Sequence, residues 1–377
     1  MKILIYNPYW NSFGGGEKYV TVLGEVLSRQ GNEVVFLALG KHIAKEKLEQ
    51  YFNADLSRVR FDCIAKFSAI ESYSQKFDIL FALTNFRAVP SQAKKTVFII
   101  QAPYGKKTLN SVLRKLAAGN PRESAKDYFR IKLLKASKHI ALVVVYSQFV
   151  QTALRLHHGI DSYVLTPPID DFFIDGIKKK KIILSVGRIF AGVYNQKRYD
   201  ITTKVFREIS RKEIPDWEYH IVGSVADDIQ SKKMLAQLQK ENEQFPVFFH
   251  CNEPYIKLKE WYNRASIFWH AAGYDVAEEK FPEQTEHFGM STVEAMSAFT
   301  VPVVINNGGQ KEIVQHTKNG FLWTTTEELK QHTLFLVHND VARNSIAQNC
   351  RDRYVLYDRN RFADDVKKMM LPIVEQK

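Results

Sequence analysis

The sequence predicts an α/β protein with two parallel β-sheets, each covered by helices. Short apolar runs of strand length alternate with helical stretches along the chain. Its 377 residues, 45% of them hydrophobic, exceed what one hydrophobic core usually serves. A stiff segment, Thr166-Pro-Pro-Ile-Asp170, followed by the basic run 178–181, separates two sets of strand candidates. We therefore expect a first domain over residues 1–167 and a second over 168–354.

Each expected domain has five strand candidates. Those of the first domain are residues 3–6, 33–39, 78–83, 96–101 and 141–146. Those of the second are residues 182–186, 217–222, 246–250, 266–270 and 301–305. Because ligands of open α/β sheets bind beyond the carboxyl ends of the strands, the segments that follow these runs are the candidates for a functional site.

The first strand is followed by three glycines, Gly14, Gly15 and Gly16, which open a helix through Val20 and Leu23. Consecutive glycines let the backbone approach a ligand closely, although a plain flexible turn remains the alternative. The G-x-G-x-x-G spacing is missing, and no strand runs directly into the glycines. This argues against a dinucleotide-dependent oxidoreductase or epimerase.

Residues 91–155 contain thirteen Lys and Arg residues but only two acidic ones, a formal charge of +11. Apolar and basic residues alternate there with helical spacing, which is typical of a helix lying on an anionic membrane surface. The apolar positions are Leu109, Val112, Leu113 and Leu116, and the basic ones beside them are Lys106, Lys107, Arg114 and Lys115. A solvated basic face remains the alternative, and an anionic glycan or a lipid-linked phosphate would suit the same residues.

A nucleic-acid-binding protein is the competing class for so basic a chain, whose net charge is +12. It predicts aromatic residues interleaved with the cations, or a recognised binding module. Only Tyr104, Tyr128 and Phe129 are aromatic between residues 101 and 140, and no such module is present. We therefore expect no nucleic-acid partner.

Cysteine usage and hydropathy indicate a cytoplasmic protein. Cys63, Cys251 and Cys350 are odd in number and fit no metal-ligand spacing. The first apolar run is too short for a signal peptide, and the run from Ile140 to Val145 has only the length of a strand.

Paired cations follow the strand candidate 182–186. Gly187-Arg188 comes directly after it, and Lys197-Arg198 follows nine residues later. The planar fork of an arginine and the compact charge of a lysine suit the two phosphates of a nucleoside diphosphate. A solvated basic turn is the alternative.

Two carboxylates, Glu286 and Glu294, flank Gly289, which opens a helix. Its first turn, with Met290 and Ser291, offers free N–H groups to an anion, and one acid lies on each side. The alternative is structural, because Ser291 and Glu294 also fit a capping box that would close the start of this helix.

Two further strand ends carry candidate residues. Gly308 and Gly309 follow the strand 301–305, and His270 ends the strand 266–270. The glycines allow a close approach to a ligand. His270 is a candidate contact to a sugar, with a core histidine bonded to backbone as the alternative. The acid pairs at 170–171 and 227–228 lack the spacing of a metal site, so no metal is expected.

Four motifs now stand in one order: Gly14-Gly-Gly-Glu17, Gly187-Arg188 with Lys197, Glu286 to Glu294, and Gly308-Gly309 with Glu312. Together they resemble the retaining glycosyltransferases of family four, over nearly the whole chain. The resemblance implies the GT-B fold, in which two Rossmann-like domains have parallel sheets that face each other across a cleft. It also implies that the acceptor binds the first domain, that the donor binds the second, and that a helix at about 355–377 crosses back onto the first.

The resemblance implies roles for individual residues. Arg188 and Lys197 would neutralise the departing diphosphate, Glu286 would act on the transferred sugar, and Glu294 would bind the ribose hydroxyls. The donor would further contact Gly187, Gly289, Met290, Ser291, Gly308, Gly309 and, on the side of the base, Glu253 and Tyr255. The sugar or acceptor would meet Gly14, Gly15, Gly16, Gln101, Tyr104 and His270.

One position departs from the family's pattern. Many members carry a histidine near the transferred sugar where this chain has Gln101. Glutamine can hydrogen-bond a sugar hydroxyl but cannot carry a proton at neutral pH, so the histidine's role is not transferred to it.

The expected activity is the transfer of a hexose, with retention, from a GDP- or UDP-linked sugar to a hydroxyl of a lipid-linked or polysaccharide acceptor. Mannose is favoured, because His287 to Ser291 and the glycine pair resemble the mannosyltransferases that extend lipid-linked oligosaccharides. A UDP-hexose-dependent glucosyl- or N-acetylglucosaminyltransferase is the alternative. We expect no cofactor beyond the donor substrate, and a peripheral location on the inner face of the membrane.

Overall fold

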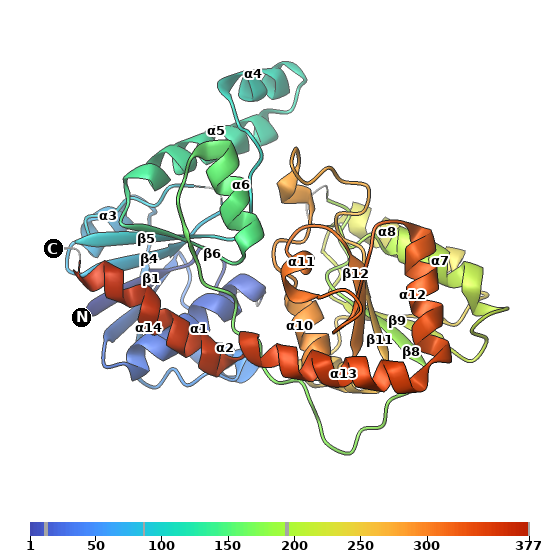
Figure 1. The fold of residues 1–377 in the computed structure, drawn as a ribbon. Coiled ribbons are helices and arrows are strands. Elements are labelled where there is room, and N and C mark those ends of the chain that lie inside the picture. Colours follow the sequence, from blue (N-terminus) through green and yellow to red (C-terminus); the bar gives the residue numbers. More distant parts are fainter. Residues whose placement is uncertain (11–13, 86, 193–195, 376–377) are drawn as a thin grey trace. The chain divides into compact units, whose positions relative to one another are not determined.

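The computed structural model of the protein describes residues 1–10, 14–85, 87–192 and 196–375. The chain forms two compact units, one made of Met1–Pro168 with Arg359–Lys377 and the other of Ile169–Asp358. Figure 1 shows that each unit contains a twisted sheet between layers of helices. The prediction of two α/β domains with parallel sheets is therefore confirmed. The expected boundary, after residue 167, lies one residue before the division between the units.

The sheet of the first unit has seven strands, all parallel. In spatial order they are β3 (Val59–Ile64), β2 (Glu33–Leu39), β1 (Lys2–Tyr6), β4 (Ile79–Leu83), β5 (Lys95–Ile100), β6 (Leu142–Val145) and β7 (Tyr163–Val164). The sequence predicts the five inner strands. It misses the two edge strands, because β3 is mostly half-buried and mixes polar with apolar residues, while β7 has only two residues.

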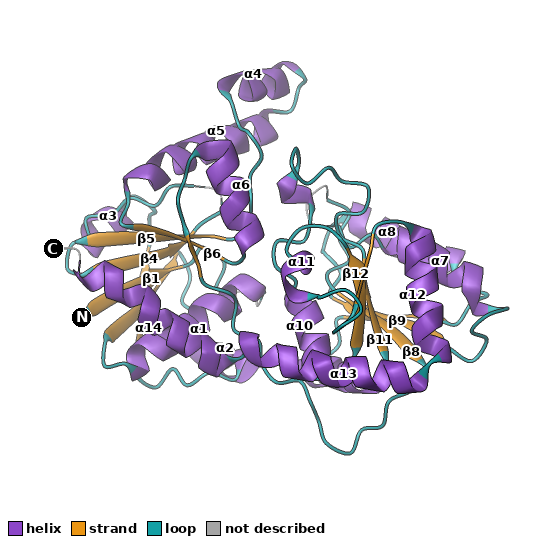
Figure 2. Cartoon of the chain, viewed as in Figure 1, coloured by secondary structure: helices purple, strands orange, loops and turns teal. Residues whose placement is uncertain are grey.

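Helices cover both faces of this sheet (Figure 2). The helices of this unit are α1 (Gly15–Arg29), α2 (Lys45–Phe52), α3 (Ala69–Ser74), α4 (Leu109–Ala117), α5 (Pro121–Ala136), α6 (Gln148–His158) and α14 (Arg359–Glu375). Among them, α4 packs against α5 and has no buried residue. Alternate residues of β1 serve opposite faces. Leu4 belongs to the cluster that contains Leu133 of α5 and Val150 of α6. On the other face α1 packs so closely that a Cβ atom at Gly24 would lie 2.2 Å from the ring of Phe36.

The last helix, α14, belongs to the first unit although it comes at the end of the chain. Phe362 is buried, and its ring lies 5.4 Å from that of Tyr19 in α1. Arg359 pairs with Glu25 at 3.1 Å. The predicted helix at about 355–377 thus begins at Arg359, after a short 3-10 turn over Val355–Tyr357.

The second unit has a six-stranded parallel sheet. In spatial order its strands are β10 (Val247–Cys251), β9 (Glu218–Gly223), β8 (Ile182–Val186), β11 (Ile267–His270), β12 (Val301–Ile305) and β13 (Phe321–Trp323). The sequence predicts all of these except the three-residue edge strand β13. Because the strands are parallel, Gly187 after β8, His270 at the end of β11 and the segment after β12 share one edge.

Helices α7 and α12 cover one face of this sheet, and α9 and α10 lie on the other. Trp269 of β11 donates to Thr333 of α12 at 3.0 Å, while the ring of the next strand residue toward the amino end, Phe268, lies 6.2 Å from that of Tyr262 in α9. The helices of this unit are α7 (Tyr199–Ser210), α8 (Ile229–Glu241), α9 (Tyr255–Arg264), α10 (Met290–Ser297), α11 (Gln310–Ile313), α12 (Thr326–His338) and α13 (Asp340–Tyr354).

Candidate active site

Three side chains meet at the carboxyl edge of the second sheet: Lys197, His270 and Glu286. The Nζ atom of Lys197 lies 2.6 Å from Oε2 of Glu286, and Nε2 of His270 lies 3.1 Å from the same oxygen. The side chains of Lys197 and Glu286 are only 14% and 11% exposed. The structure therefore joins two residues that the sequence predicts as catalytic with one that it predicts as a sugar contact.

The protonation of this trio follows from its geometry. Burial alone would raise the pKa of Glu286, but Lys197 and His270 hold it well below its usual range. Burial and the charge of Lys197 lower the pKa of His270. A neutral imidazole that donates Nε2–H to the carboxylate satisfies these conditions. Glu286 is thus ionised at neutral pH, and His270 fixes its orientation. Among the described residues, His270 is therefore bonded to a carboxylate and not to the backbone, which the core-histidine alternative expected, and its contact with a sugar stays a prediction.

Gly187 makes room for Lys197. A Cβ atom at this position would lie 2.7 Å from Cε of Lys197, so any other residue would displace the lysine. The neighbouring Arg188 is exposed and makes no hydrogen bond or ion pair with the described residues. The two predicted clamp cations therefore differ, since one is buried against a carboxylate and the other lies in solvent.

Helix α10 begins at Met290, and Gly289 is its N-cap in the left-handed conformation, with φ of 116°. Ser291 thus lies inside the first turn and caps nothing, so the capping-box alternative is wrong. Glu294 instead accepts a hydrogen bond from the hydroxyl of Tyr262 at 2.9 Å. Burial, followed by the charge of Glu294, raises the pKa of Tyr262 and keeps this hydroxyl protonated. The sequence carries no signal for this partner, which comes from α9.

The glycine pair shapes the segment that carries Glu286. The N–H of Gly309 donates to the carbonyl of Glu286 at 2.8 Å, and the N–H of Gly308 donates to Glu278 at 2.7 Å. A Cβ atom at Gly308 would lie 2.3 Å from the same carbonyl oxygen. Both N–H groups are thus bound within the protein. The contact of this glycine pair with the donor stays a prediction.

Gln310 places a buried amide behind α10 that the sequence does not predict. Gln310 is fully buried, and neither amide atom has a hydrogen-bond partner among the described residues. A Cβ atom at Gly289 would lie 3.0 Å from its Oε1. Its position directly after the glycine pair is the one signal that the sequence offers.

The loop after β10 and the first residue of α9 are the two positions predicted on the side of the base. Glu253 accepts a hydrogen bond from Nε1 of Trp261 at 2.8 Å and lies 3.3 Å from Nδ1 of His250. The hydroxyl of Tyr255 donates to Asp170 at 3.3 Å, and its ring packs edge-on against Phe172. Glu253 is therefore anchored to its own unit through both carboxylate oxygens.

In the first unit, the glycines before α1 meet Gln101. A Cβ atom at Gly16 would lie 2.7 Å from Nε2 of Gln101, and the N–H of Gly14 donates to Glu17 at 2.6 Å. Gln101 accepts from Asn85 at 2.7 Å and donates to the hydroxyl of Tyr146. The structure thus brings Gly14 to Gly16 and Gln101 together, and their contact with a sugar or an acceptor stays a prediction.

Tyr104, predicted as a sugar or acceptor contact, lies in the core of the first unit, and that contact stays a prediction. It is 4% exposed and belongs to the same hydrophobic cluster as Leu133. Its hydroxyl donates to the backbone carbonyl of Asn85, so it has no free polar group to offer.

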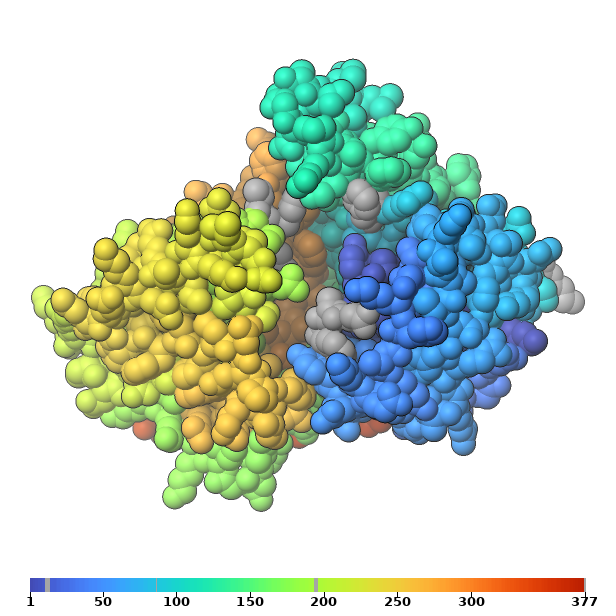
Figure 3. Space-filling view, turned by 180° about the vertical axis from the view of Figure 1, so that it is seen from behind, coloured from blue at the N-terminus to red at the C-terminus, as the bar shows by residue number. Residues whose placement is uncertain are grey.

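The predicted membrane-binding helix is α4. Its leucines Leu109, Leu113 and Leu116 are 58%, 61% and 54% exposed. The residues around α4 project from the first unit in Figure 3. Lys115 forms an ion pair at 2.6 Å with the buried Asp127 of α5, so it holds α4 in place. No helix in the described part of the chain is long and apolar enough to span a bilayer.

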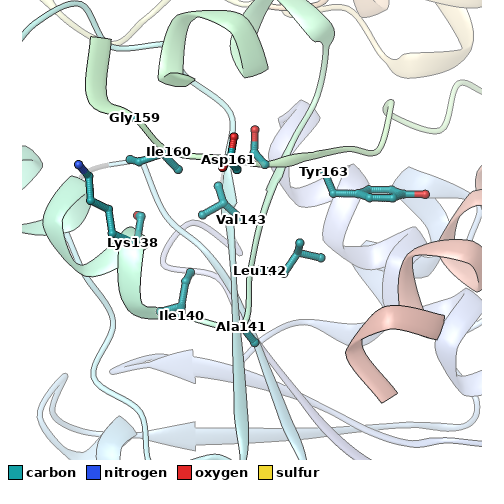
Figure 4. A pocket seen from close by; sticks show the side chains of 11 residues that line it. Lys138, Ile140, Ala141, Leu142, Val143, Gly159, Ile160, Asp161 and Tyr163 are labelled. Carbon is teal, nitrogen blue, oxygen red and sulfur yellow. The ribbon is translucent and has the colours of Figure 1, made fainter. Parts of the chain in front are cut away.

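A separate pocket of about 450 Å³ lies in the first unit at the amino ends of β6 and β7 (Figure 4). Lys138, Leu142, Asp161 and Tyr163 are among the residues that line it. It lies at the opposite ends of these strands from the carboxyl edge where Gln101 stands, and it contains none of the predicted site residues.

Comparison with known proteins adds to this geometry. Residues 169–353 match the family model described as glycosyl transferases group 1. Over 232 residues the chain is 25% identical to a GDP-Man:Man(3)GlcNAc(2)-PP-Dol alpha-1,2-mannosyltransferase of Dictyostelium discoideum, which covers 58% of this chain and 44% of that protein. Over 165 residues it is 30% identical to an uncharacterized glycosyltransferase of Haemophilus influenzae, covering 43% of this chain and 40% of the relative. The match thus spans less than half of either relative's length.

The fold is also that of solved structures. The crystal structure of Anabaena HepE in complex with UDP and glucose superposes with a TM-score of 0.71 and 15% identity, covering 98% of this chain and 99% of that one. At this identity the similarity shows the fold alone, which is GT-B.

Proposed function

Because residues 169–353 match the family model of the group 1 glycosyl transferases, we propose that the protein transfers a hexose from a nucleoside-diphosphate sugar to a hydroxyl of a glycan acceptor. The observation that carries this proposal is the buried pair of Lys197 and Glu286 at the carboxyl edge of the second sheet. This pair sets a cation and an ionised carboxylate next to the close-approach backbone of Gly187. When the bond between a sugar and a diphosphate breaks, a cation stabilises the departing diphosphate and a carboxylate stabilises positive charge at the anomeric carbon.

The cations act on the leaving group. Negative charge grows on the diphosphate as the glycosidic bond breaks, and Lys197 and Arg188 stabilise it together with the N–H groups at the start of α10. In the free protein Lys197 is paired with Glu286, so a bound diphosphate draws its Nζ atom away from this carboxylate. Arg188 lies in solvent and turns toward the phosphates without breaking any contact with the described residues.

Glu286 acts on the sugar. Its carboxylate, held ionised and oriented by His270, binds a hydroxyl of the hexose and steadies positive charge near the anomeric carbon. No side chain among the described residues identifies itself as a covalent nucleophile. Retention at the anomeric carbon and independence of metal ions are part of the proposal through the family resemblance. Glu294 binds the ribose hydroxyls from the other side of the start of α10.

Mannose from GDP-mannose is the favoured donor, and a lipid-linked glycan is the favoured acceptor. Both follow the name of the Dictyostelium relative, which specifies GDP-Man and a PP-Dol acceptor. A polysaccharide acceptor is the variant of this proposal. The second candidate is a UDP-hexose-dependent glucosyl- or N-acetylglucosaminyltransferase, since HepE was solved with UDP and glucose.

A lipid-linked acceptor would require the protein to work at a membrane surface. We propose that α4 lies on the anionic inner face of the membrane, with Leu109, Leu113 and Leu116 in the interface and Lys106, Lys107 and Arg114 on the headgroups. The exposure of these leucines beside cations supports the proposal, which also places the protein in the cytoplasm.

A screen of donor hydrolysis tests the proposed function. Release of GDP or UDP is measured without acceptor from GDP-mannose, UDP-glucose and UDP-N-acetylglucosamine, each with and without a chelator. We expect release from one donor class, unchanged by the chelator, and its loss in Glu286→Gln. NMR of the sugar transferred to a simple acceptor gives the anomeric outcome. Release from none of these donors would contradict the proposal, and inversion would contradict retention.

A further inference from the structure

A second cluster of titratable groups lies on strands β9 and β10, outside the trio of Lys197, His270 and Glu286. Nδ1 of His220 faces Nε2 of His250 at 2.9 Å. The outer nitrogen of His220 lies 3.0 Å from Glu218, and the outer nitrogen of His250 lies 3.3 Å from Glu253. These four side chains, Glu218, His220, His250 and Glu253, form a continuous row that we call the histidine chain.

The surroundings of the histidine chain favour a cation within it. The indole ring of Trp261 lies 4.5 Å from the ring of His220 and 4.2 Å from that of His250, and the face of an indole attracts an imidazolium. A carboxylate stands at each end. Against this, Lys180, just before β8, repels positive charge on His220. The side chains of His220 and His250 are mostly buried.

Two neutral imidazole rings have too few N–H groups to make all the hydrogen bonds of the histidine chain. Its three contacts are one between the rings and one at each carboxylate, and each contact needs one N–H group. Two neutral imidazoles supply only two N–H groups, so one contact then sets a lone pair against an acceptor. A single added proton completes all three. Among the described residues no cluster of three or more such groups is arranged to hold a metal ion.

The added proton binds below neutral pH. Burial lowers the pKa of both His220 and His250, and Glu218 and Glu253 oppose this effect. At pH 8 the histidine chain therefore lacks one of its three hydrogen bonds. This bond forms on acidification below the ordinary histidine pKa of about 6.5.

The far end of the histidine chain fixes a loop at the ligand-binding edge of the sheet. Glu253 belongs to the loop 252–254 that follows β10. The neighbouring Asn252 has the left-handed conformation, and its N–H donates to Gly223 at 3.0 Å while its Oδ1 accepts from Val225 at 3.2 Å. The loop is thus tied to the end of β9 through Asn252 and to the histidine chain through Glu253. Loops at this edge are where ligands of open α/β sheets bind.

We propose that His220 and His250 are positioning residues for the base of the donor, because they hold the loop 252–254 through Glu253 and hold it in full only when the pair carries an added proton. The inference rests on the proposed function, since it needs a nucleoside diphosphate at this edge. As a consequence, the contribution of the base to donor binding increases as the pH falls. The contribution of the phosphates does not depend on the protonation of His220 and His250.

Nitrogen NMR of the imidazoles in the full chain tests the proton count without any ligand. Between pH 8.5 and 5 we expect His220 and His250 to take up one proton jointly, with a proton shared between their facing nitrogens. Glu218→Gln replaces a half-exposed carboxylate and should shift this uptake to lower pH with the fold intact. His332→Gln is the control, because His332 also packs against a histidine, His316, but by ring contact alone. Two independent titrations would overturn the inference.

Calorimetry at pH 8.0 and 5.5 then tests the link to the base. GDP, UDP and inorganic pyrophosphate are titrated into the wild type, His220→Gln and His332→Gln. The affinity for the better nucleotide relative to pyrophosphate should increase roughly three- to tenfold on acidification in the wild type and in His332→Gln, as expected for one hydrogen bond gained. This ratio should stay constant in His220→Gln.

The remaining outcomes separate the two proposals. An equal change of the ratio in the wild type and in His220→Gln would overturn the positioning role, while leaving the donor site intact. Binding of neither nucleotide nor pyrophosphate by the wild type would refute the proposed function and the role toward the base with it, whereas the NMR titration would still decide the proton count. If His220→Gln does not fold, Glu218→Gln replaces it. In this variant the affinity for the nucleotide relative to pyrophosphate should increase only at a lower pH than in the wild type.

Discussion

At the scale of single residues, Lys197 and Arg188 carry the same charge in different surroundings, and this difference separates the effects of replacing them. We expect Arg188→Ala to slow transfer roughly 100-fold without changing the melting temperature, since Arg188 is exposed. Lys197→Ala should slow transfer as much and also destabilise the fold by roughly 3 kcal/mol, because it leaves the carboxylate of Glu286 buried without its cation. Turnover assays and thermal unfolding measure the two effects.

The control for these two replacements is a third cation of the second unit. Lys240→Ala removes an exposed cation from α8 and should change neither quantity. If either clamp variant transfers sugar at nearly the wild-type rate while binding the donor normally, the assignment of the clamp is wrong.

Glu294 allows a second separation of roles. Glu294→Gln keeps an oxygen that can accept from the hydroxyl of Tyr262, so its melting should stay within about 1 kcal/mol of the wild type. The ribose role predicts a donor affinity roughly tenfold lower, measured by calorimetry. Tyr262→Phe is the matched variant, since it removes the buried hydrogen bond and leaves the carboxylate. Unchanged affinity in Glu294→Gln would show that the residue serves Tyr262 rather than a ligand.

The sequence predicted the three residues Lys197, His270 and Glu286 more readily than the contacts between them. Glu286 and Lys197 stand in motifs with regular spacing, whereas the bond between His270 and Glu286 depends on β11 and the segment before α10 meeting at one sheet edge. Tyr262 and Gln310 were missed for the same reason, because the hydrogen bond of Tyr262 to Glu294 and the close approach of Gln310 to Gly289 join residues far apart in the sequence. The burial of Tyr104 was not predicted, since the sequence pattern of an aromatic residue after a strand is the same whether it faces a ligand or the core.

At the scale of elements, α4 gives a test of membrane binding. The protein should sediment with anionic vesicles at low salt, and less as the salt concentration increases, because each basic residue at the surface contributes about 1 kcal/mol that salt screens. The combined change of Lys106, Lys107 and Arg114 to Gln should weaken this binding. Hydrolysis of the donor in solution should stay unaltered, since Lys197 and Glu286 belong to the second unit.

Lys115→Gln is the matched control on the same helix. Its ion pair with Asp127 joins α4 to α5, so its loss should lower the stability of the helix more than the affinity for vesicles. Equal sedimentation with anionic and neutral vesicles, or with neither, would refute the membrane role. The basic residues would then be candidates for binding a soluble anionic acceptor.

The elements themselves could be predicted where their environment is uniform. Inner strands such as β4 and β12 are buried on both faces and read as continuous apolar runs. Edge strands differ from this pattern, so their sequences resemble loops. The edge strand β13 has only three residues, and β3 pairs with one neighbour and is mostly half-buried. A capping box at Ser291 stayed open as an alternative because Ser291 is a good cap, whereas the N-cap of α10 is the left-handed Gly289, two residues before the position that this box needs.

At the scale of the whole molecule, buried histidines make stability depend on pH. Burial lowers the pKa of six of them: His158, His220, His250, His270, His287 and His332. The unfolded chain takes up protons on these side chains near pH 6.5, while the folded protein takes them up only at lower pH. Between these values the unfolded state binds more protons, so stability falls as the pH falls.

We therefore expect the melting temperature to decrease steadily from pH 7.5 to 5.0 in a thermal unfolding series. Carboxylates with a lowered pKa, such as Glu286 and Asp127, extend the loss to still lower pH. His332→Gln should flatten the slope, because it removes one of the groups that titrate differently in the two states. A melting temperature that is highest near pH 5.5 would contradict this expectation.

The placement of α14 affects how the first unit folds during translation. The first unit is built from the two ends of the chain, and Phe362 and Arg359 complete the surface around Tyr19 and Glu25 of α1. The second unit is continuous in sequence. During translation, residues 1–168 emerge first but lack the helix that covers α1, and the second unit has all its residues before that helix is made. The first unit is thus begun first but completed last. An apolar strip of α1 stays exposed on the nascent first unit until the last turns of α14 leave the exit tunnel.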